Sequence, residues 1–118
     1  MKKLIFVLGL LLLFVSSHSF AQEVIASKDA KDNIGKTAQV KGKVASIFAS
    51  KNGNTYINFD EKSPNQTFTV ALFKDAQVDI SSITEGCILT VSGEIKDYKG
   101  KPEIILTKAD QIISIEQP

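Results

Sequence analysis

Apolar and polar residues alternate with a period of two in four stretches of the chain, which is the pattern of β-strands with one buried face. These stretches are residues 37–50, 55–60, 67–73 and 87–97, and a fifth strand is predicted at residues 103–107. In the first stretch, the buried face is assigned to Ala38, Val40, Gly42 and Val44. Asn52-Gly53 is a strong hairpin signal between the first two strands. The pattern therefore predicts a small all-β domain.

The last two predicted strands form a hairpin with a Tyr-Lys-Gly-Lys-Pro tip at residues 98–102. Its core-facing residues are expected to be Leu89, Val91, Ile95, Ile104 and Leu106. We expect this hairpin to close a small β-barrel. Residues 112–115 supply either a final edge strand or a packing segment, and residues 74–85 break the alternation, so that their structure stays open.

Two glycines occupy positions within predicted strands where a side chain is expected. Gly42 lies in Val-Lys-Gly-Lys-Val and Gly93 in Val-Ser-Gly-Glu-Ile. A glycine inside a strand indicates a bulge or a sharp bend. We therefore predict two bent strands at equivalent corners of the barrel, the first of which serves both of its halves.

A short helix is predicted before the first strand. Ala26, Ala30 and Ile34 have helical spacing, Ser27 is a candidate N-cap and Gly35 a candidate C-terminal stop. A helix of about two turns is marginal alone, so we expect it to pack on one end of the barrel.

The first 21 residues have the pattern of a secretory signal peptide. Lys2 and Lys3 precede an apolar run at residues 4–15, and Ser19 and Ala21 suit a cleavage site. The run is shorter than the ~20 residues needed to span a bilayer. The alternative is an uncleaved N-terminal anchor. We expect cleavage, a periplasmic or secreted protein, and no stable membrane anchor afterwards.

Cleavage changes the charge of the chain as well as its length. It leaves 97 of the 118 residues, in which 12 lysines face 13 acidic residues, for a formal charge of about −1. The expected organisation is a signal peptide at residues 1–21, a polar approach and short helix at 22–36, and one barrel domain at 37–118. This charge balance does not favour strong nonspecific binding to nucleic acid.

The composition excludes most catalytic chemistry. The only histidine is His18, inside the predicted signal, and the chain has neither arginine nor tryptophan. A single cysteine, Cys87, forms neither an internal disulfide nor a thiolate metal site, and we expect it to be a small buried residue. Asp60 and Glu61 are the only adjacent acidic pair, and neighbours in a strand point to opposite faces. The sequence predicts no enzyme, no cofactor and no metal.

The order of the short motifs VKGKV, YINFD, PNQTFTVALF, LTVSGEI and YKGKPEIIL resembles the OB-fold nucleic-acid-binding family. The resemblance covers residues 27–112 and implies a five-stranded Greek-key barrel. It is similar in particular to small OB modules found alone in exported bacterial proteins or beside staphylococcal-nuclease-like domains. A second similar group is the bacterial periplasmic OB-fold family, often linked to stress and to cationic or small ligands.

In an OB-fold the ligand lies across the second and third strands, between two loops. The resemblance therefore implies a nucleic-acid-binding face made of Lys51, Tyr56, Asn58, Thr69, Phe73, Tyr98, Lys99 and Lys101. Aromatic residues stack on bases and lysines follow phosphates. Two alternatives stay open: Tyr56 pairs across strands with Phe73 or Thr69, and the lysines of the tip are ordinary solvated turn residues.

Two functions from different classes follow from this resemblance. The favoured one is a noncatalytic exported module that binds single-stranded nucleic acid or a similar extended polyanion. The alternative is a periplasmic stress or adaptor protein that binds an envelope protein, a glycan or a small ligand. The near-neutral charge and the absence of arginine and tryptophan favour this alternative.

Overall fold

The computed structural model describes residues 22–118, so the predicted signal peptide at residues 1–21 lies outside the described part of the chain. The described part has eight strands rather than the five predicted, and two short 3-10 helices. In chain order the elements are β1 (Val24–Ala26), η1 (Ser27–Asn33), β2 (Thr37–Ala49), β3 (Thr55–Phe59), β4 (Phe68–Leu72), β5 (Ile88–Glu94), β6 (Lys96–Tyr98), β7 (Lys101–Ile105), η2 (Ala109–Gln111) and β8 (Ile112–Glu116). Neither helix in this part of the chain has the length and apolar character that a membrane span requires.

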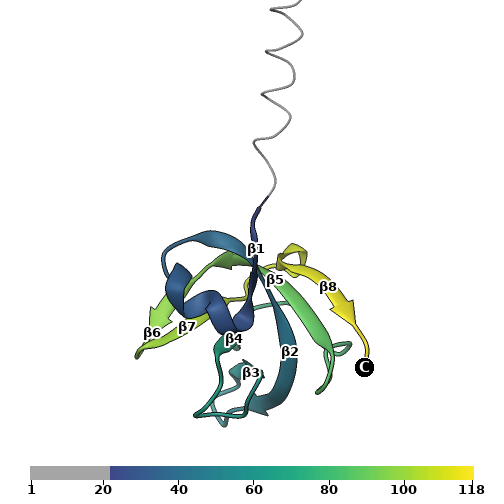
Figure 1. Cartoon of the computed structure of the whole chain (residues 1–118). Helices are drawn as coiled ribbons and strands as arrows, with labels where there is room; N and C mark the ends of the chain where they lie inside the picture. Colours follow the sequence, from purple (N-terminus) through teal and green to yellow (C-terminus); the bar gives the residue numbers. More distant parts are fainter. Residues whose placement is uncertain (1–21) are drawn as a thin grey trace, which may run out of the picture.

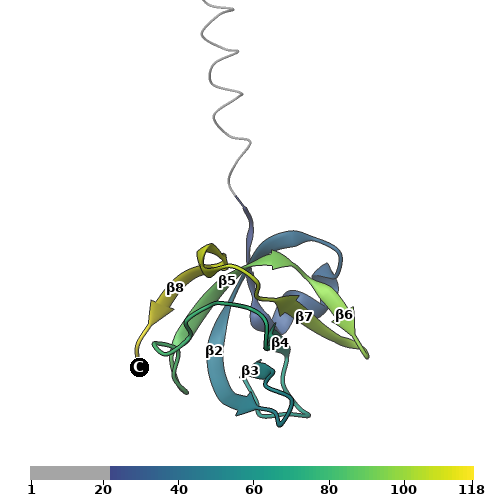
Figure 2. The same ribbon diagram turned by 180° about the vertical axis from the view of Figure 1, so that it is seen from behind.

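The strands form one curved, open sheet in the order β6-β7-β4-β3-β2-β5-β8, and β1 adds to β2 on the side (Figure 1, Figure 2). The five predicted strands correspond to β2, β3, β4, β5 and β7. β1 and β8 are additional, although the sequence already indicated an edge strand at the position of β8, and β6 overlaps the end of the predicted fourth strand. A mostly β fold of this order agrees with the predicted OB architecture, and β5 and β7 are not hydrogen-bonded neighbours, as in a partly open barrel.

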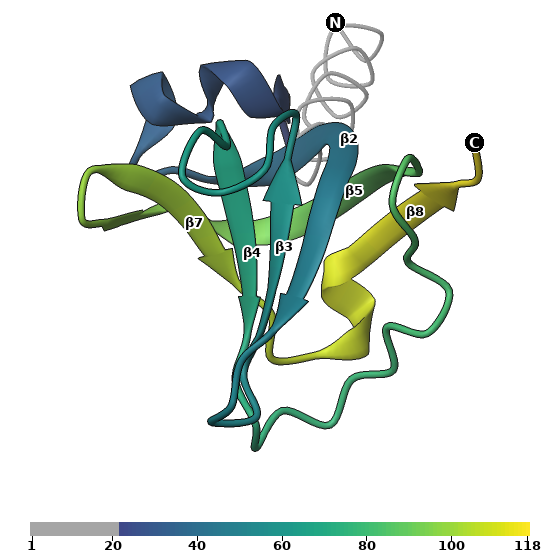
Figure 3. The same cartoon turned by 90° about the horizontal axis from the view of Figure 1, so that it is seen from below.

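The long strand β2 belongs to both halves of the fold, as the sequence predicted. Its first half pairs with β5, from Thr37↔Glu94 to Lys43↔Ile88, and its second half pairs with β3. The register shifts between Val44 and Ser46, so that Ala45 is an extra residue opposite β3. This bulge bends the strand between its two partners. Figure 3 shows β2 curving from β5 onto β3.

Gly42 lies beside the bulge but has another role. A Cβ atom there would lie 2.7 Å from the Cβ of Ser27 and 2.9 Å from the ring of Phe59. Glycine is therefore required because η1 and β3 approach the β2 backbone closely. The prediction that Ser27 caps the helix is wrong: the N-cap residue is Ala26, without a side-chain cap, and the buried Ser27 hydroxyl donates a hydrogen bond to Asp60 at 2.6 Å.

The predicted terminal hairpin forms only at its tip, and its two long strands pair with other parts of the sheet. Its first strand breaks at Ile95, whose backbone exchanges hydrogen bonds with Gly35 and Lys36. β5 then pairs with β2 and β8, and only the short β6 pairs with β7. β7 begins two residues earlier than predicted and runs parallel to β4, from Thr69↔Glu103 to Ala71↔Ile105. This parallel pairing connects the hairpin to β4.

The core lies between the two halves of the curved sheet and under η1. All five core-facing residues predicted for the hairpin are buried, as are Ala38, Val40 and Val44 of β2. The rings of Phe59 and Phe68 meet edge to face, with centroids 5.0 Å apart. Ala30 of η1 is fully buried, so the predicted short segment does pack on the sheet, as a 3-10 helix. Residues 73–87 form an irregular connection without strand or helix (Figure 3). This connection contributes Ile83 to the core.

We expect Gly42→Ala to lower the free energy of unfolding by about 1–3 kcal/mol, because the added methyl overpacks the junction of β2, η1 and β3. Chemical denaturation measures this change. Lys43→Ala, at an exposed neighbouring position of the same strand, is the control and should shift stability by about 0.5 kcal/mol or less. A Gly42→Ala variant as stable as the parent would contradict the account of Gly42.

Candidate functional site

Two parallel rows of side chains cross the outer face of β2, β3, β4 and β7, because the strand registers align them. The first row is apolar. Phe48 pairs with Tyr56, Tyr56 with Ala71, and Ala71 with Ile105. Phe48 is 59% exposed and Tyr56 partly exposed. The Tyr56 hydroxyl accepts a hydrogen bond from Asn54 at 3.4 Å. This aromatic row presents two rings at the surface.

The second row is polar and lies two residues along each strand from the first, on the same face. It connects Ser46 to Asn58, Asn58 to Thr69, and Thr69 to Glu103. The Thr69 hydroxyl donates to Asn58 Oδ1 at 3.1 Å, and Asn58 Nδ2 donates to Ser46 Oγ at 3.2 Å. The amide of Gln66, in the β3–β4 loop, donates to Thr69 Oγ1 at 3.2 Å. These bonds hold the polar row in fixed orientations on three strands.

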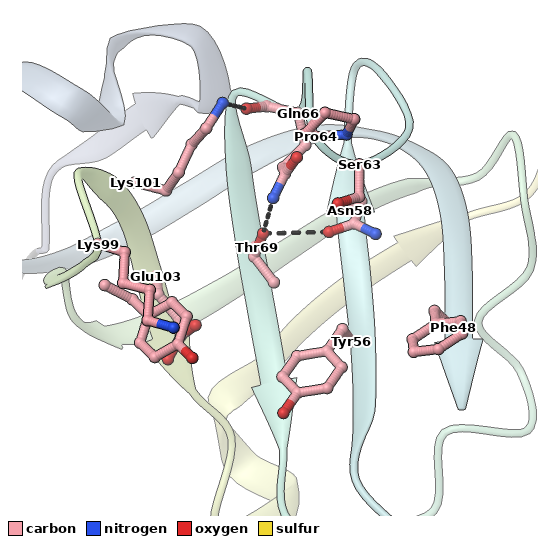
Figure 4. Close-up of a pocket in the computed structure, with 11 residues that line it drawn as sticks. Phe48, Tyr56, Asn58, Ser63, Pro64, Gln66, Thr69, Lys99, Lys101 and Glu103 are labelled. Carbon is pink, nitrogen blue, oxygen red and sulfur yellow. Dashed lines mark hydrogen bonds between the residues drawn. The ribbon is translucent and has the colours of Figure 1, made fainter. Parts of the chain in front are cut away.

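Part of each row forms the floor of a surface groove of about 370 Å³: Phe48 and Tyr56 from the first row, and Asn58, Thr69 and Glu103 from the second. The β3–β4 loop and the β6–β7 tip rise on its sides (Figure 4). The groove is lined by Phe48, Tyr56, Asn58, Ser63, Pro64, Gln66, Thr69, Tyr98, Lys99, Lys101 and Glu103. Its position on β3 and β4 is the one where OB-folds bind their ligands.

Glu103 is the only acidic residue of the groove lining, and it is 7% exposed. Its carboxylate makes no hydrogen bond or ion pair with any residue in the range 22–118. Burial raises the pKa of the Glu103 carboxyl above its ordinary value of 4.5, because the low-dielectric surroundings disfavour the charged form. The sheet thus holds an acceptor group that no protein donor satisfies.

The β6–β7 tip is a tight turn that sets the lysines beside the groove. Lys99 and Gly100 both have positive φ, 51° and 87°, as a two-residue hairpin turn of the primed type requires. Asp97 Oδ1 accepts a hydrogen bond from the Gly100 N–H at 2.9 Å. Lys99 Nζ lies 5.3 Å from the centre of the Tyr98 ring. The tip therefore presents a cation and an aromatic ring together.

Lys101 connects this tip to the opposite wall, because its Nζ donates to the Gln66 carbonyl at 3.1 Å.

Six of the eight site residues predicted from the sequence line the groove together: Tyr56, Asn58, Thr69, Tyr98, Lys99 and Lys101. The other two lie elsewhere. Lys51 is exposed in the β2–β3 turn, and Phe73 is 43% exposed beyond the end of β4.

Sequence reasoning missed five residues of the groove lining, namely Phe48, Ser63, Pro64, Gln66 and Glu103. Phe48 was missed because the alternation of β2, continued from Val44, places it on the core side. The bulge at Ala45 reverses this phase. Only a signal for a bulge, such as Gly42, could have indicated that Phe48 faces outward. Glu103 required the parallel register with β4, which sequence does not give.

The groove holds no set of ligands suited to a metal ion. Across the described residues, no group of three or more histidine, cysteine, aspartate or glutamate side chains could hold one. Cys87 is a free thiol in the core, fully buried, as predicted. The groove's chemistry is therefore that of aromatic rings, amides, one carboxyl and lysines, which suits noncovalent recognition.

The fold and the groove define an OB-fold, and the chain belongs to the family described as the OB-fold nucleic acid binding domain. The family matches residues 38–112, from the start of β2 to the start of β8. This match confirms the resemblance deduced from the order of the motifs. No curated protein sequence matches the chain.

Several solved structures align with the chain at low sequence identity. An aspartyl-tRNA synthetase from Leishmania major Friedlin aligns with a TM-score of 0.54 and 10% identity, over 79% of this chain but 21% of its own. The chain thus spans about a fifth of that synthetase. The OBody AM1L10, solved bound to hen egg-white lysozyme, aligns with a TM-score of 0.49, 13% identity and coverage of 71% and 84%. The S. pombe telomere capping protein Ten1 aligns at 0.42, 19% identity and coverage of 75% and 81%.

Because the pKa of Glu103 is raised on folding, this residue destabilises the native state more as pH rises from 4.5 through its folded pKa. The penalty is absent well below pH 4.5 and is complete once the pH exceeds the folded pKa. We expect Glu103→Gln to raise the thermal midpoint at pH 7 and to lose this advantage near pH 4. Thermal unfolding between pH 4 and 8 measures the effect. Glu85→Gln, at an exposed position, should not reproduce it, and equal behaviour of the two variants would refute the assignment.

Proposed function

We propose that this protein is a noncatalytic, exported OB-fold module that binds single-stranded nucleic acid in the groove across β3 and β4. One observation supports it above others: within a nucleic-acid-binding family, the strand registers place two exposed aromatic rings beside a fixed polar row. Bases have faces for stacking and edges for hydrogen bonding, so the two rows suit the two aspects of a base.

The aromatic row would supply the greater part of the affinity. Stacking of a base on an aromatic side chain is worth about 1–3 kcal/mol, and it tolerates any base. Phe48 and Tyr56 face the groove from adjacent strands (Figure 4). A strand bound with its bases over these rings has its phosphates toward the exterior, where Lys99 and Lys101 lie on one wall of the groove. A groove with two lysines predicts modest affinity and a shallow salt dependence.

Binding without catalysis is supported by the ionisable groups of the groove. They are two lysines, two tyrosines and Glu103. The sequence after residue 21 contains no histidine and no arginine, the residues most used for proton transfer and for clamping a phosphate. General acid–base catalysis by two carboxyl groups requires a second carboxyl, and Glu103 is the only one in the groove lining.

Export to the periplasm or the exterior is part of the same proposal, and its support is the sequence pattern of residues 1–21. The predicted cleavage after Ala21 leaves Gln22 as the first residue. Extracellular or periplasmic nucleic acid is then the accessible ligand, and an envelope glycan or protein is the competitor that a binding screen must include.

We expect labelled single-stranded oligonucleotides to bind at low salt, with affinity that falls as salt rises. Tyr56→Ala should weaken binding about 5- to 100-fold through the loss of stacking. Lys99→Ala should weaken it less and should reduce the salt slope by about one. Fluorescence anisotropy at two or more salt concentrations measures both effects.

Two variants serve as matched controls for this experiment. Phe73→Ala removes an exposed aromatic ring outside the groove, and Lys31→Ala removes an exposed lysine of η1. Both should bind like the parent. Absence of oligonucleotide binding at low salt, with binding to an envelope glycan instead, would replace the proposed function by the alternative. Unchanged affinity in Tyr56→Ala and Lys99→Ala would refute the site alone.

We also expect the protein, when expressed with residues 1–21 in a bacterium, to be recovered outside the cytoplasm with Gln22 at its N-terminus. Intact-mass measurement of the periplasmic and culture fractions checks both points. Replacing Ala21 with a large residue should block processing, because signal peptidases require a small residue there. A cytoplasmic protein of full length would contradict the proposal of export.

A further inference from the structure

The hydrogen bonds of the polar row run in one direction and leave acceptors at its end. Gln66 Nε2 donates to Thr69 Oγ1, and the only hydroxyl proton of Thr69 goes to Asn58 Oδ1. Thr69 is the register partner of Glu103 on the adjacent strand, yet it has no proton left to donate to that carboxylate. The Glu103 oxygens therefore enter the groove without a protein donor.

The lysines around Glu103 do not supply that donor either. Lys96 is its register partner on β6, but its ammonium lies 3.9 Å from Glu94. Lys101 donates to the Gln66 carbonyl, and Lys99 lies over the Tyr98 ring. No ion pair joins Glu103 to any lysine of the described chain. The carboxylate is thus an acceptor in the groove despite having three lysines on neighbouring positions.

A second acceptor, on the groove-lining residue Gln66, is also without a partner but lies below the surface. Gln66 Oε1 is buried and has no hydrogen-bond partner among residues 22–118, whereas the nitrogen of the same amide is bonded to Thr69. Leaving a buried acceptor unpaired costs about 1–3 kcal/mol. Because that oxygen has almost no exposed surface, the acceptor that a ligand in the groove can reach is the Glu103 carboxylate on β7.

We propose that Glu103 selects a ligand that carries N–H donors, specifically a nucleobase with an exocyclic amino group. This inference rests on the proposed function and names the part of the strand that the groove reads. A bare polyphosphate or sulfated chain brings only acceptors, which would face a carboxylate. The amino group of cytosine or adenine donates N–H bonds to such an acceptor. Acidic side chains accept from cytosine N4 in this way.

The neighbouring aromatic row makes a planar base the suitable carrier of that amino group. Tyr56 lies on β3 two residues from Asn58, so a ring stacked on it has its edge toward the polar row. Thymine provides the sharpest contrast with cytosine. The two pyrimidines have nearly the same shape, but thymine presents an O4 acceptor where cytosine presents its N4 donors.

The test compares oligo-dC, oligo-dT and an abasic oligonucleotide of equal length by fluorescence anisotropy at pH 7.5. These probes carry equal phosphate charge. We expect the unaltered protein to bind oligo-dC at least tenfold more tightly than oligo-dT, and the abasic probe least. Glu103→Gln should reduce the dC-to-dT ratio to about threefold or less, because an amide also donates to O4.

Glu85→Gln is the matched control, since it makes the same change of charge at an exposed position outside the groove, and it should keep the full dC-to-dT ratio. Equal binding of oligo-dC and oligo-dT by the unaltered protein would overturn the inference and leave the proposed function intact. This comparison needs no variant, so it holds even if Glu103→Gln folds poorly. Failure of all three probes to bind would overturn the proposed function and the inference with it.

Discussion

The parallel pairing of β4 with β7 is the interaction on which the rest of the groove depends. It places Glu103 beside Thr69 and Ile105 beside Ala71, which extends both rows by one strand. It also orients the β6–β7 tip, so that Lys99, Lys101 and Tyr98 line the side of the groove. A parallel pair cannot be joined by a tight turn. The chain therefore passes through 73–87, β5 and β6 between β4 and β7, and the pairing depends on the whole domain being folded.

Local alternation predicted the strands and most of the core because each buried face follows directly from a period of two. The residues Leu89, Val91 and Ile95 are buried for this reason. Non-local register was beyond the same reasoning. Nothing in the sequence indicates that β7 pairs with β4 instead of β5. Glu103 was therefore interpreted as an ordinary strand residue. The two hairpin strands were expected to pair with each other, whereas they pair with several other strands.

The candidate site shows the same division between local and non-local information. Tyr56, Asn58 and Thr69 were predicted because the OB-fold resemblance places the ligand on the second and third strands, where these residues alternate with core residues. Phe73 continues that alternation, but β4 ends at Leu72 and the groove does not extend there. Lys51 lies in the expected loop, but a loop position does not fix the direction of a side chain. Ser27, expected to cap a helix, instead joins η1 to Asp60 through a hydrogen bond.

The bulge at Ala45 has a consequence for how this surface can vary. Before it, the even-numbered residues Val40 and Val44 of β2 point into the core. After it, the even-numbered Phe48 lines the groove, and Ser46 accepts a hydrogen bond from Asn58 of the groove lining. One strand therefore carries two independent sets of constraints, which meet at a single inserted residue. Substitutions at Ser46 and Phe48 can alter what the groove recognises without repacking the barrel. Related chains could diverge in ligand along this half of the strand while the other half stays fixed.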